Sequence, residues 1–252
     1  LSARSGLDES GKLIFDCGAE VEGPSPYKPD YIYPAADFRP DFADAPIVCY
    51  HRGQRLKLND GQSLGDVYDP YFNRTWKHFC SHRHTPNRPE PSGFVIGSLK
   101  GQIGYIAYPI FTLYQAYGTV AYRAFAGKVI RAMLDNSPTV ETNLPSGARI
   151  TLQHQPRHQR KILHLLYAPK WLRGAAHLRE MDPDQCAAVE VIEELIPLHN
   201  TTITVVSDKP VTSVKLQPEN SDVAFEQVAP GRYRFTIDEF TCHQMVELSY
   251  SN

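Results

Sequence analysis

The sequence predicts an α/β domain over residues 1–137, followed by a small antiparallel β-sandwich over residues 138–252. Three observations predict this order. An apolar β-like run at 102–108 leads toward a strongly amphipathic segment at 120–134, and a strand that delivers the chain into a helix is typical of α/β domains. After residue 138, about seven short β-like runs follow one another, as expected of a sandwich. An Asn-Ser-Pro sequence at 136–138 separates the two patterns and places the boundary near residue 137.

The first elements of the chain are predicted from apolar spacing and turn residues. Residues 5–18 are expected to form a helix, because Leu13, Ile14 and Cys17 give an apolar stripe, Ser5 or Asp8 can cap it, and Gly18 can end it. Residues 23–46 are rich in proline and aspartate with interleaved aromatic residues. They predict a long irregular connection that aromatic side chains hold in place.

Short β-like runs and one long helix follow. A strand is expected at 47–50, and the runs 54–58 and 64–68 flank an Asn-Asp-Gly sequence that favours a hairpin. A second hairpin is expected from 93–99 and 102–108 around Lys-Gly. The segment 120–134 has apolar residues at helical spacing and basic residues available to its opposite face, which predicts the clearest helix of the chain.

Turn residues separate the β-like runs of the second half. The expected strands are 149–154, 161–167, 189–195, 201–206, 211–217, 223–228 with 233–237, and 245–250. The charged stretch 171–186 contains Gly174 and Pro183, so it is expected to be a loop with at most one helical turn.

The composition excludes several classes of protein. Of the 252 residues, 42% are hydrophobic and 21% are charged, as in globular proteins. The 26 basic and 28 acidic residues nearly cancel, so no nucleic-acid partner is expected. No apolar run approaches the ~20 residues that cross a bilayer, so no membrane partner is expected. The five cysteines are widely spread without a CxxC pair, which favours reduced thiols and a cytoplasmic location.

The segment Asp69–Pro86, DPYFNRTWKHFCSHRHTP, is the main candidate for a functional site. Trp76 and Phe79 could serve as platforms for a sugar or a partner subunit, with Arg74, His78 and His82 as hydrogen-bonding groups. His84 belongs to the same candidate set. Loops beside rigid elements commonly carry function, so this segment is expected to face a carbohydrate or a subunit interface.

Two other interpretations of this segment remain open. His78, Cys80, His82 and His84 alternate at a spacing of two, so on a strand they would share one face and could bind Zn²⁺ or a similar metal. Consecutive alternate positions cannot easily surround a tetrahedral ion, however, and no metal or other cofactor is assigned. The segment could also be a polar loop whose histidines bond neighbouring backbone groups.

The remaining reactive side chains do not predict an active site. Cys17 lacks the glycine-flanked elbow of a cysteine nucleophile and lies on an apolar stripe, so a structural role is expected. Glycoside hydrolysis needs two facing carboxyl groups. The crowded acids are in contexts typical of solvated faces: Glu9, Asp16, Glu20, Glu22, Glu193 and Glu194. None of them is assigned as catalytic.

Several motifs together resemble one family. They are SGLDESGKLIFDCGAE, PDYIYPA, DPYFNRTWKHFCSHRHTP, GYIAYPIFTLYQAYG, TNLPSGARITLQHQP, HLLYAP and VEVIEELIPL. These stretches resemble the carboxy-terminal part of bacterial glycoside hydrolases that carry a β-galactosidase-type trimerisation domain, the middle domain of glycoside hydrolase family 42, with α-L-fucosidase-like relatives. The resemblance covers nearly the whole chain.

The resemblance implies a specific organisation and function. Residues 1–137 would be the last part of a trimerisation-type α/β domain similar to the class I glutamine amidotransferase (flavodoxin-like) fold, with a β-hairpin insert. The catalytic (β/α)₈ barrel of such enzymes has no counterpart in this sequence, so the chain is expected to be a non-catalytic accessory and oligomerisation region. Its expected partners are a carbohydrate, reached through the parent enzyme, and further copies of itself.

Two alternatives to this function stay open. The first is a stand-alone carbohydrate-binding or interaction module with Trp76, Tyr167 and Trp171 as aromatic platforms. The second is a metal-dependent enzyme built on His78, His82 and His84.

Overall fold

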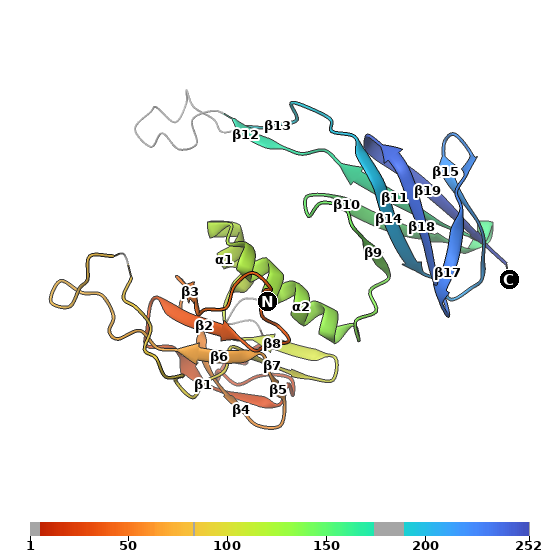
Figure 1. The fold of residues 1–252 in the computed structure, drawn as a ribbon. Helices are drawn as coiled ribbons and strands as arrows, with labels where there is room; N and C mark the ends of the chain where they lie inside the picture. Colours follow the sequence, from red (N-terminus) through yellow and green to blue (C-terminus); the bar gives the residue numbers. More distant parts are fainter. Residues whose placement is uncertain (1–5, 83, 174–188, 252) are drawn as a thin grey trace. The chain divides into compact units, whose positions relative to one another are not determined.

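The computed structural model describes residues 6–82, 84–173 and 189–251. The chain divides into two compact units, unit 1 (Leu1–Ser137) and unit 2 (Pro138–Asn252), each of which encloses its own hydrophobic core (Figure 1). The division falls within the Asn-Ser-Pro sequence at which the residue pattern changes. Among the described residues, no helix is long and apolar enough to cross a membrane.

Unit 1 is built from short strands that precede two helices. Its elements are β1 (Ala19–Pro24), β2 (Asp30–Pro34), β3 (Ile47–Cys49), β4 (Gln54–Leu58), β5 (Gln62–Ser63), β6 (Gly65–Tyr68), β7 (Gly97–Lys100), β8 (Ile103–Ile106), α1 (Ile110–Tyr117) and α2 (Val120–Met133). The strands form three small antiparallel sheets with the orders β1-β4, β3-β2-β6 and β5-β7-β8. Side chains from these sheets and from both helices, among them Leu56, Ile96, Tyr108 and Phe125, share one buried cluster.

The prediction of a flavodoxin-like α/β domain in unit 1 is wrong. Every strand pairing described in unit 1 is antiparallel, and the molecule is mostly β with two described helices. A flavodoxin-like sheet needs parallel strands that alternate with crossover helices. Here the strands come first, and α1 and α2 follow them consecutively, so the single step from β8 into a helix is not part of a repeated β-α-β unit.

The prediction of a helix at residues 5–18 is also wrong. The described residues from Gly6 onward form turns and a short bridge between Leu7 and Leu13. The Asp8 carboxylate accepts hydrogen bonds from the backbone N–H groups of Ser10 and Lys12, so it organises a turn and does not cap a helix. Gly6 and Gly11 have φ values of 80° and 82°, which a continuous right-handed helix excludes.

The Asn-Asp-Gly sequence does not close the expected hairpin. β4 pairs with β1, and β6 pairs with β2, so the two flanking strands belong to different sheets. The N–H groups of Asn59 and Gly61 instead donate to the carbonyl of Gly18, 2.9 and 3.0 Å away. A long-range contact therefore overrides the local turn preference. Asp30–Pro34, which lies inside the expected irregular connection, forms β2 at the centre of its sheet.

Other local predictions for unit 1 are confirmed. β7 and β8 form the hairpin around Lys100-Gly101, and β3 occupies the strand expected at 47–50. The long helix is α2, whose buried residues Tyr122, Phe125 and Val129 recur at helical spacing. Positive φ values at Asp135 and Asn136 follow it, so the chain cannot continue as a helix. The short helix α1 was not predicted, and Gly118 ends it in the left-handed conformation.

Unit 2 consists mainly of two antiparallel sheets. Its elements are β9 (Val140–Thr142), β10 (Arg149–Gln155), a 3₁₀ turn (Pro156–His158), β11 (Arg160–Tyr167), β12 (Trp171–Arg173), β13 (Val189–Val191), β14 (Leu198–Val206), β15 (Val211–Gln217), β16 (Ser221–Asp222), β17 (Phe225–Ala229), β18 (Arg232–Phe240) and β19 (Cys242–Tyr250). One sheet has the order β10-β11-β19-β15-β16 and the other has the order β17-β18-β14-β9. Inward residues of both, such as Leu163, Val205, Phe235 and Val246, form the core.

Every strand expected in unit 2 is present, within a few residues at its ends. The run expected at 189–195 is shorter, because β13 ends at Val191 and pairs only with β12. The loop expected at 171–186 begins instead with this strand β12, and its remainder lies outside the described residues.

Candidate functional site

The candidate site is the 69–86 loop of unit 1, which follows β6 and leads toward β7. Its two ends are joined by a bridge between Pro70 and Asn87 and by a hydrogen bond from the Arg88 N–H to the Asp69 carbonyl. The loop therefore begins and ends at one place, and its middle extends away from that base.

Side chains fix the base of the loop to β2 and to the turn that precedes it. The side-chain amide of Asn73 donates to the carbonyl of Pro26, and its oxygen accepts the N–H of Lys28, at 2.9 and 3.0 Å. The hydroxyl of Thr85 donates to the Phe72 carbonyl across the loop at 2.8 Å. The buried hydroxyl of Tyr31 donates to the Thr85 carbonyl. Burial raises the pKa of Tyr31 to about 12, so this group remains a donor at neutral pH.

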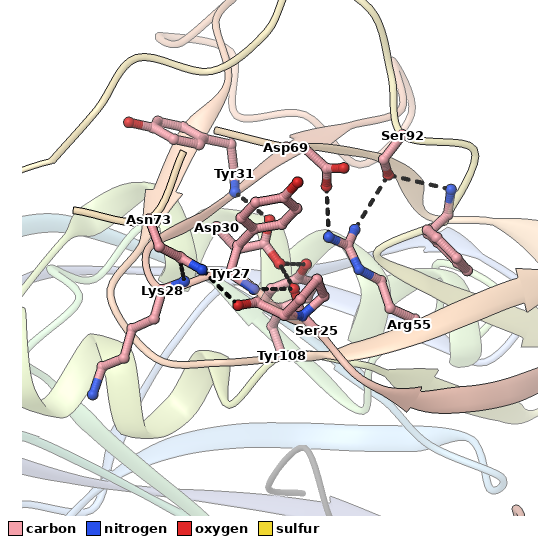
Figure 2. A network of polar contacts seen from close by, with 12 residues as sticks. Ser25, Tyr27, Lys28, Asp30, Tyr31, Arg55, Asp69, Asn73, Ser92 and Tyr108 are labelled. Atoms are coloured by element: carbon pink, nitrogen blue, oxygen red, sulfur yellow. Dashed lines mark hydrogen bonds and ion pairs between the residues drawn. The ribbon is translucent and has the colours of Figure 1, made fainter. Parts of the chain in front are cut away.

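A buried carboxyl group lies beneath this base. Asp30 is fully buried, and it accepts hydrogen bonds from the hydroxyls of Ser25 and Tyr108 at 2.6 and 2.8 Å (Figure 2). Burial raises the pKa of the Asp30 carboxyl above its ordinary value, while the Ser25 hydrogen bond and the nearby charge of Arg55 act in the opposite direction. Because Asp30 has no exposed surface, no substrate can reach it, and its role is structural.

Arg55 joins the two ends of the loop region. Its guanidinium, on β4, contacts Asp69 at 2.6 Å, where the loop begins, and Ser92 at 3.4 Å, beyond its end (Figure 2). It also lies over the rings of Tyr27 and Phe94, with centroid distances of 5.5 and 5.0 Å. A planar group with several fixed donors suits this bridging position better than a lysine would.

The tip of the loop presents aromatic and basic side chains to solvent. Trp76 is 83% exposed and Phe79 is 68% exposed, fractions among the highest of the described large apolar side chains. The Thr75 N–H donates to the His78 carbonyl at 2.7 Å and the His78 N–H donates to the Thr75 hydroxyl at 3.1 Å, so a tight turn holds this tip. The ammonium of Lys77 lies 5.1 Å from the Trp76 ring centre.

The predicted site residues separate into two groups. Arg74, Trp76, His78 and His82 are exposed along the outer part of the loop. His84 is half-buried instead, and its ring packs edge-on against Tyr50 at a centroid distance of 5.7 Å. His84 thus belongs to the anchoring of the loop.

The four alternating metal-ligand candidates do not form a cluster. Within the described ranges, no group of three or more His, Cys, Asp or Glu side chains is placed to hold a metal ion. Cys80 instead directs its thiol toward the carbonyls of His82 and His84, at 3.6 and 3.5 Å. This geometry gives the metal-enzyme alternative no support.

Two of the acids considered as catalytic groups form ion pairs, and the cysteine is buried. Lys100 bridges Asp16 and Asp60, and its hydrogen bond lowers the pKa of the Asp16 carboxyl. Arg173 pairs with Glu193 at 2.6 Å and lowers the pKa of that carboxyl. Cys17 is fully buried, and burial raises the pKa of its thiol, which disfavours the nucleophilic thiolate.

The tip of the loop is a protrusion and does not itself enclose a ligand. Grooves of about 620 Å³ lie along β17 and β18 and beside Lys100, and neither of them includes a residue of the 69–86 loop. A protruding aromatic side chain can contact one face of a ligand. A second surface would be needed to enclose that ligand.

Replacing Asn73 with alanine tests how the loop is held. We expect backbone amides of residues 74–82 to exchange hydrogen several-fold faster, because two hydrogen bonds to the Pro26–Lys28 turn are lost. The free energy of unfolding should fall by about 1 kcal/mol. Hydrogen–deuterium exchange measures the first effect, and Asn87→Ala is the control, since the Asn87 amide donates to the adjacent Arg88 carbonyl. Equal exchange in both variants would contradict this anchoring.

The sequence indicated the loop as a candidate site, but its supporting contacts were not predicted. Asp30 lies inside the quoted motif PDYIYPA, and Arg55 lies inside the β-like run QRLKL. The sequence does not distinguish Arg55 from a solvated strand residue, because QRLKL also carries Lys57 two positions later; only the burial of Arg55 shows that its charge needs a partner. Its partners, Asp69 and Ser92, could not be identified without the tertiary structure.

Comparison with solved structures gives a strong similarity to an α-L-fucosidase. α-L-Fucosidase isoenzyme 2 from Paenibacillus thiaminolyticus is 33% identical over 99% of this chain, with a TM-score of 0.89, and the chain covers 36% of that protein's length. Two β-galactosidases resemble it only weakly, at 10% identity. They are Gan42B from G. stearothermophilus, with a TM-score of 0.42, and the enzyme from Rahnella sp. R3, with a TM-score of 0.43.

No protein-family model matches the sequence, and no curated protein matches it significantly. The fucosidase similarity extends over both units and agrees with the resemblance found in the sequence motifs. The chain is therefore related to glycoside hydrolases. Its sequence and fold are similar to a part of the α-L-fucosidase that makes up 36% of that protein's length.

Proposed function

We propose that this chain is a non-catalytic accessory region of a carbohydrate-active glycoside hydrolase of the α-L-fucosidase type. In this proposal the 69–86 loop shapes a sugar site that is completed by another part of the enzyme or by a neighbouring subunit. The similarity to the fucosidase supports the class of enzyme. The observation that carries the role of the loop is its construction, a firmly anchored base below an exposed tip with Trp76.

The chemistry of the tip suits a sugar ligand. An indole ring packs against the C–H face of a sugar, while Arg74 and the neighbouring histidines can bond to hydroxyl groups. The turn at Thr75–His78 and the anchoring by Asn73 reduce the entropy lost when the tip contacts a ligand. Acids that could act as a facing catalytic pair are not part of the loop, so the bond-breaking groups would come from elsewhere in the enzyme.

Replacing Trp76 with alanine in the native gene product tests this role. We expect kcat/KM for an aryl α-L-fucoside to fall about tenfold, chiefly through a higher KM, because an exposed aromatic contact worth about 1.4 kcal/mol is removed. The matched control is Phe42→Ala, since Phe42 is an exposed aromatic residue (64%) of the same unit outside the loop. If both variants kept the same kcat/KM, the proposed role of the loop would be wrong.

A stand-alone carbohydrate-binding module is the second candidate function. It is favoured by a second exposed indole, Trp171 on β12, which is 49% exposed with Arg173 over its ring. The two functions differ in the behaviour of the isolated 252-residue chain. Calorimetric binding of fucosides by this chain, lost in Trp76→Ala or Trp171→Ala, would favour the module. Binding that requires the remainder of the enzyme would favour the accessory region.

A further inference from the structure

Two histidines and a methionine lie together on the outer face of the five-stranded sheet of unit 2. His164 on β11 is directly opposite Met245 on β19, and His243 precedes Met245 by two residues on the same strand. Residues opposite one another, and residues two apart along a strand, project from the same face. The alternate residues Leu163 and Val246 point into the core, so the three side chains face outward.

The two imidazole rings point their nitrogens at each other. Nδ1 of His164 lies 3.1 Å from Nε2 of His243. The ring centres are 5.4 Å apart and the ring planes differ by 18°. The distance between the ring centres is close to the sum of three lengths: the distance between the two nitrogens and the distance from each nitrogen to its own ring centre. Both nitrogens therefore lie near the line that joins the ring centres. One ring donates its N–H and the other accepts it, so the pair is a nearly linear N–H···N hydrogen bond.

From this arrangement we propose a binding site for a soft monovalent metal ion, Cu(I), formed by His164, His243 and Met245. Two opposed imidazole nitrogens suit a nearly linear pair of bonds to Cu(I), and the thioether of Met245 adds a third, soft ligand of the kind that selects this ion. A metal with bonds of about 2 Å fits between the nitrogens after they separate by about 1 Å. This movement needs only small side-chain rotations on an outward face.

Proton balance does not oppose this binding. In the hydrogen-bonded pair, one of the two facing nitrogens carries a proton. When the metal replaces that proton, the ring moves it to its other nitrogen, so both rings stay neutral imidazoles and no net proton is released. No oxidation or reduction accompanies the step when the ion is supplied as Cu(I).

The surrounding charges favour a soft ion over a hard divalent one. The nearest acid on the same face of β19 is Glu247, which accepts hydrogen bonds from Arg160 at 2.9 Å and from Gln217 at 3.4 Å. This carboxylate is therefore already engaged, and the ligand set consists of neutral nitrogen and sulfur groups. Zn²⁺ and Mg²⁺ would lack the additional charged or oxygen ligands that they usually require.

The test is a competition titration of the purified chain with Cu(I) under ascorbate, using bicinchoninate as the competing ligand. Free cysteines bind Cu(I) strongly by themselves, and Cys17 and Cys49 are fully buried, so the titration uses a background in which the other three, Cys80, Cys186 and Cys242, are serine. We expect one Cu(I) per chain, no comparable uptake of Zn²⁺, and about tenfold weaker binding in His164→Ala and in His243→Ala.

Two further variants separate a built site from general histidine binding. His199→Ala is the control, because His199 is an exposed histidine on β14 of the other sheet, paired with Glu239 at 3.3 Å. Met245→Leu should remove the sulfur contribution from the copper X-ray absorption spectrum while thermal unfolding stays the same. The proposal is overturned if His199→Ala weakens binding as much as His164→Ala, or if the double variant His164→Ala/His243→Ala binds as tightly as the background.

Discussion

Replacing Arg55 with alanine is expected to lower the free energy of unfolding of unit 1 by about 3 kcal/mol. The guanidinium is only 7% exposed and contacts Asp69, which is 25% exposed. Removal of the guanidinium leaves the partly buried Asp69 carboxylate without its cation. It also removes a positive charge close to the buried carboxyl group of Asp30. The partial exposure of Asp69 places the expected loss at the lower end of the range for a broken buried pair. Denaturant titration of unit 1 measures it.

The same substitution should also loosen the 69–86 loop, because Arg55 holds both Asp69 and Ser92. Arg52→Ala is the matched control: it removes an exposed arginine three residues earlier, with an expected change within about 0.5 kcal/mol. A variant of Arg55 as stable as the Arg52 variant would show that the buried ion pair contributes nothing net to unit 1. Faster exchange in the loop without loss of global stability would assign Arg55 a purely local role.

In unit 2, Phe235→Ala should lower the free energy of unfolding by about 3–5 kcal/mol. Phe235 is 2% exposed on β18 and packs in the core between the two sheets. Truncation removes its buried apolar surface and leaves a cavity that the neighbouring side chains fill only in part. Because each unit has its own core, we expect the transition of unit 2 to shift while that of unit 1 stays in place. Differential scanning calorimetry can follow both transitions.

The adjacent residue provides the control for this prediction. Thr236 points to the opposite, exposed face of β18, and Thr236→Ala should change the stability by about 0.5 kcal/mol or less. Similar losses from both substitutions would contradict the alternation of buried and exposed residues along β18. A parallel shift of both calorimetric transitions would show that the two units unfold together.

Local signals in the sequence predicted individual elements better than they predicted the fold. The helix α2 and the β7–β8 hairpin follow from apolar spacing and a Lys-Gly turn, and the structure contains both. In unit 2, alternation alone identified strands such as β18, because each has one face in the core and one in solvent. These elements are specified mainly by residues close to one another in the chain.

The fold of unit 1 could not be predicted in the same way, because distant residues decide it. β4 has a strong turn signal beside it but pairs with β1, at least thirty residues earlier. Gly18 receives the N–H groups of the Asn-Asp-Gly turn, and a Cβ added at Gly18 would lie 2.3 Å from the Gly61 nitrogen. This close approach, not a helix end, explains the glycine. The α/β interpretation relied on one strand-to-helix step and on a family resemblance, and neither one fixes the sheet topology.

For the candidate site, the sequence indicated the position of the loop but not the contacts that anchor it. The density of aromatic and basic residues indicated the 69–86 loop as a candidate, and Trp76 within it is 83% exposed. The alternation of His78, Cys80 and His82 suggested a shared strand face, but this segment is not a strand, so the alternation has no geometric consequence. The anchoring by Asn73 and Arg55 depends on contacts between segments that the sequence alone does not bring together.

The central claim is that these residues support a sugar site without breaking the glycosidic bond themselves. The most direct measurement is the rate at which the purified 252-residue chain hydrolyses a chromogenic α-L-fucoside. We predict a rate equal to that of buffer alone, because Asp16 and Glu193 are held in ion pairs with Lys100 and Arg173, and Asp30 is buried beyond the reach of substrate. Sustained turnover by the chain, abolished by replacing a single one of its carboxylates, would contradict this account.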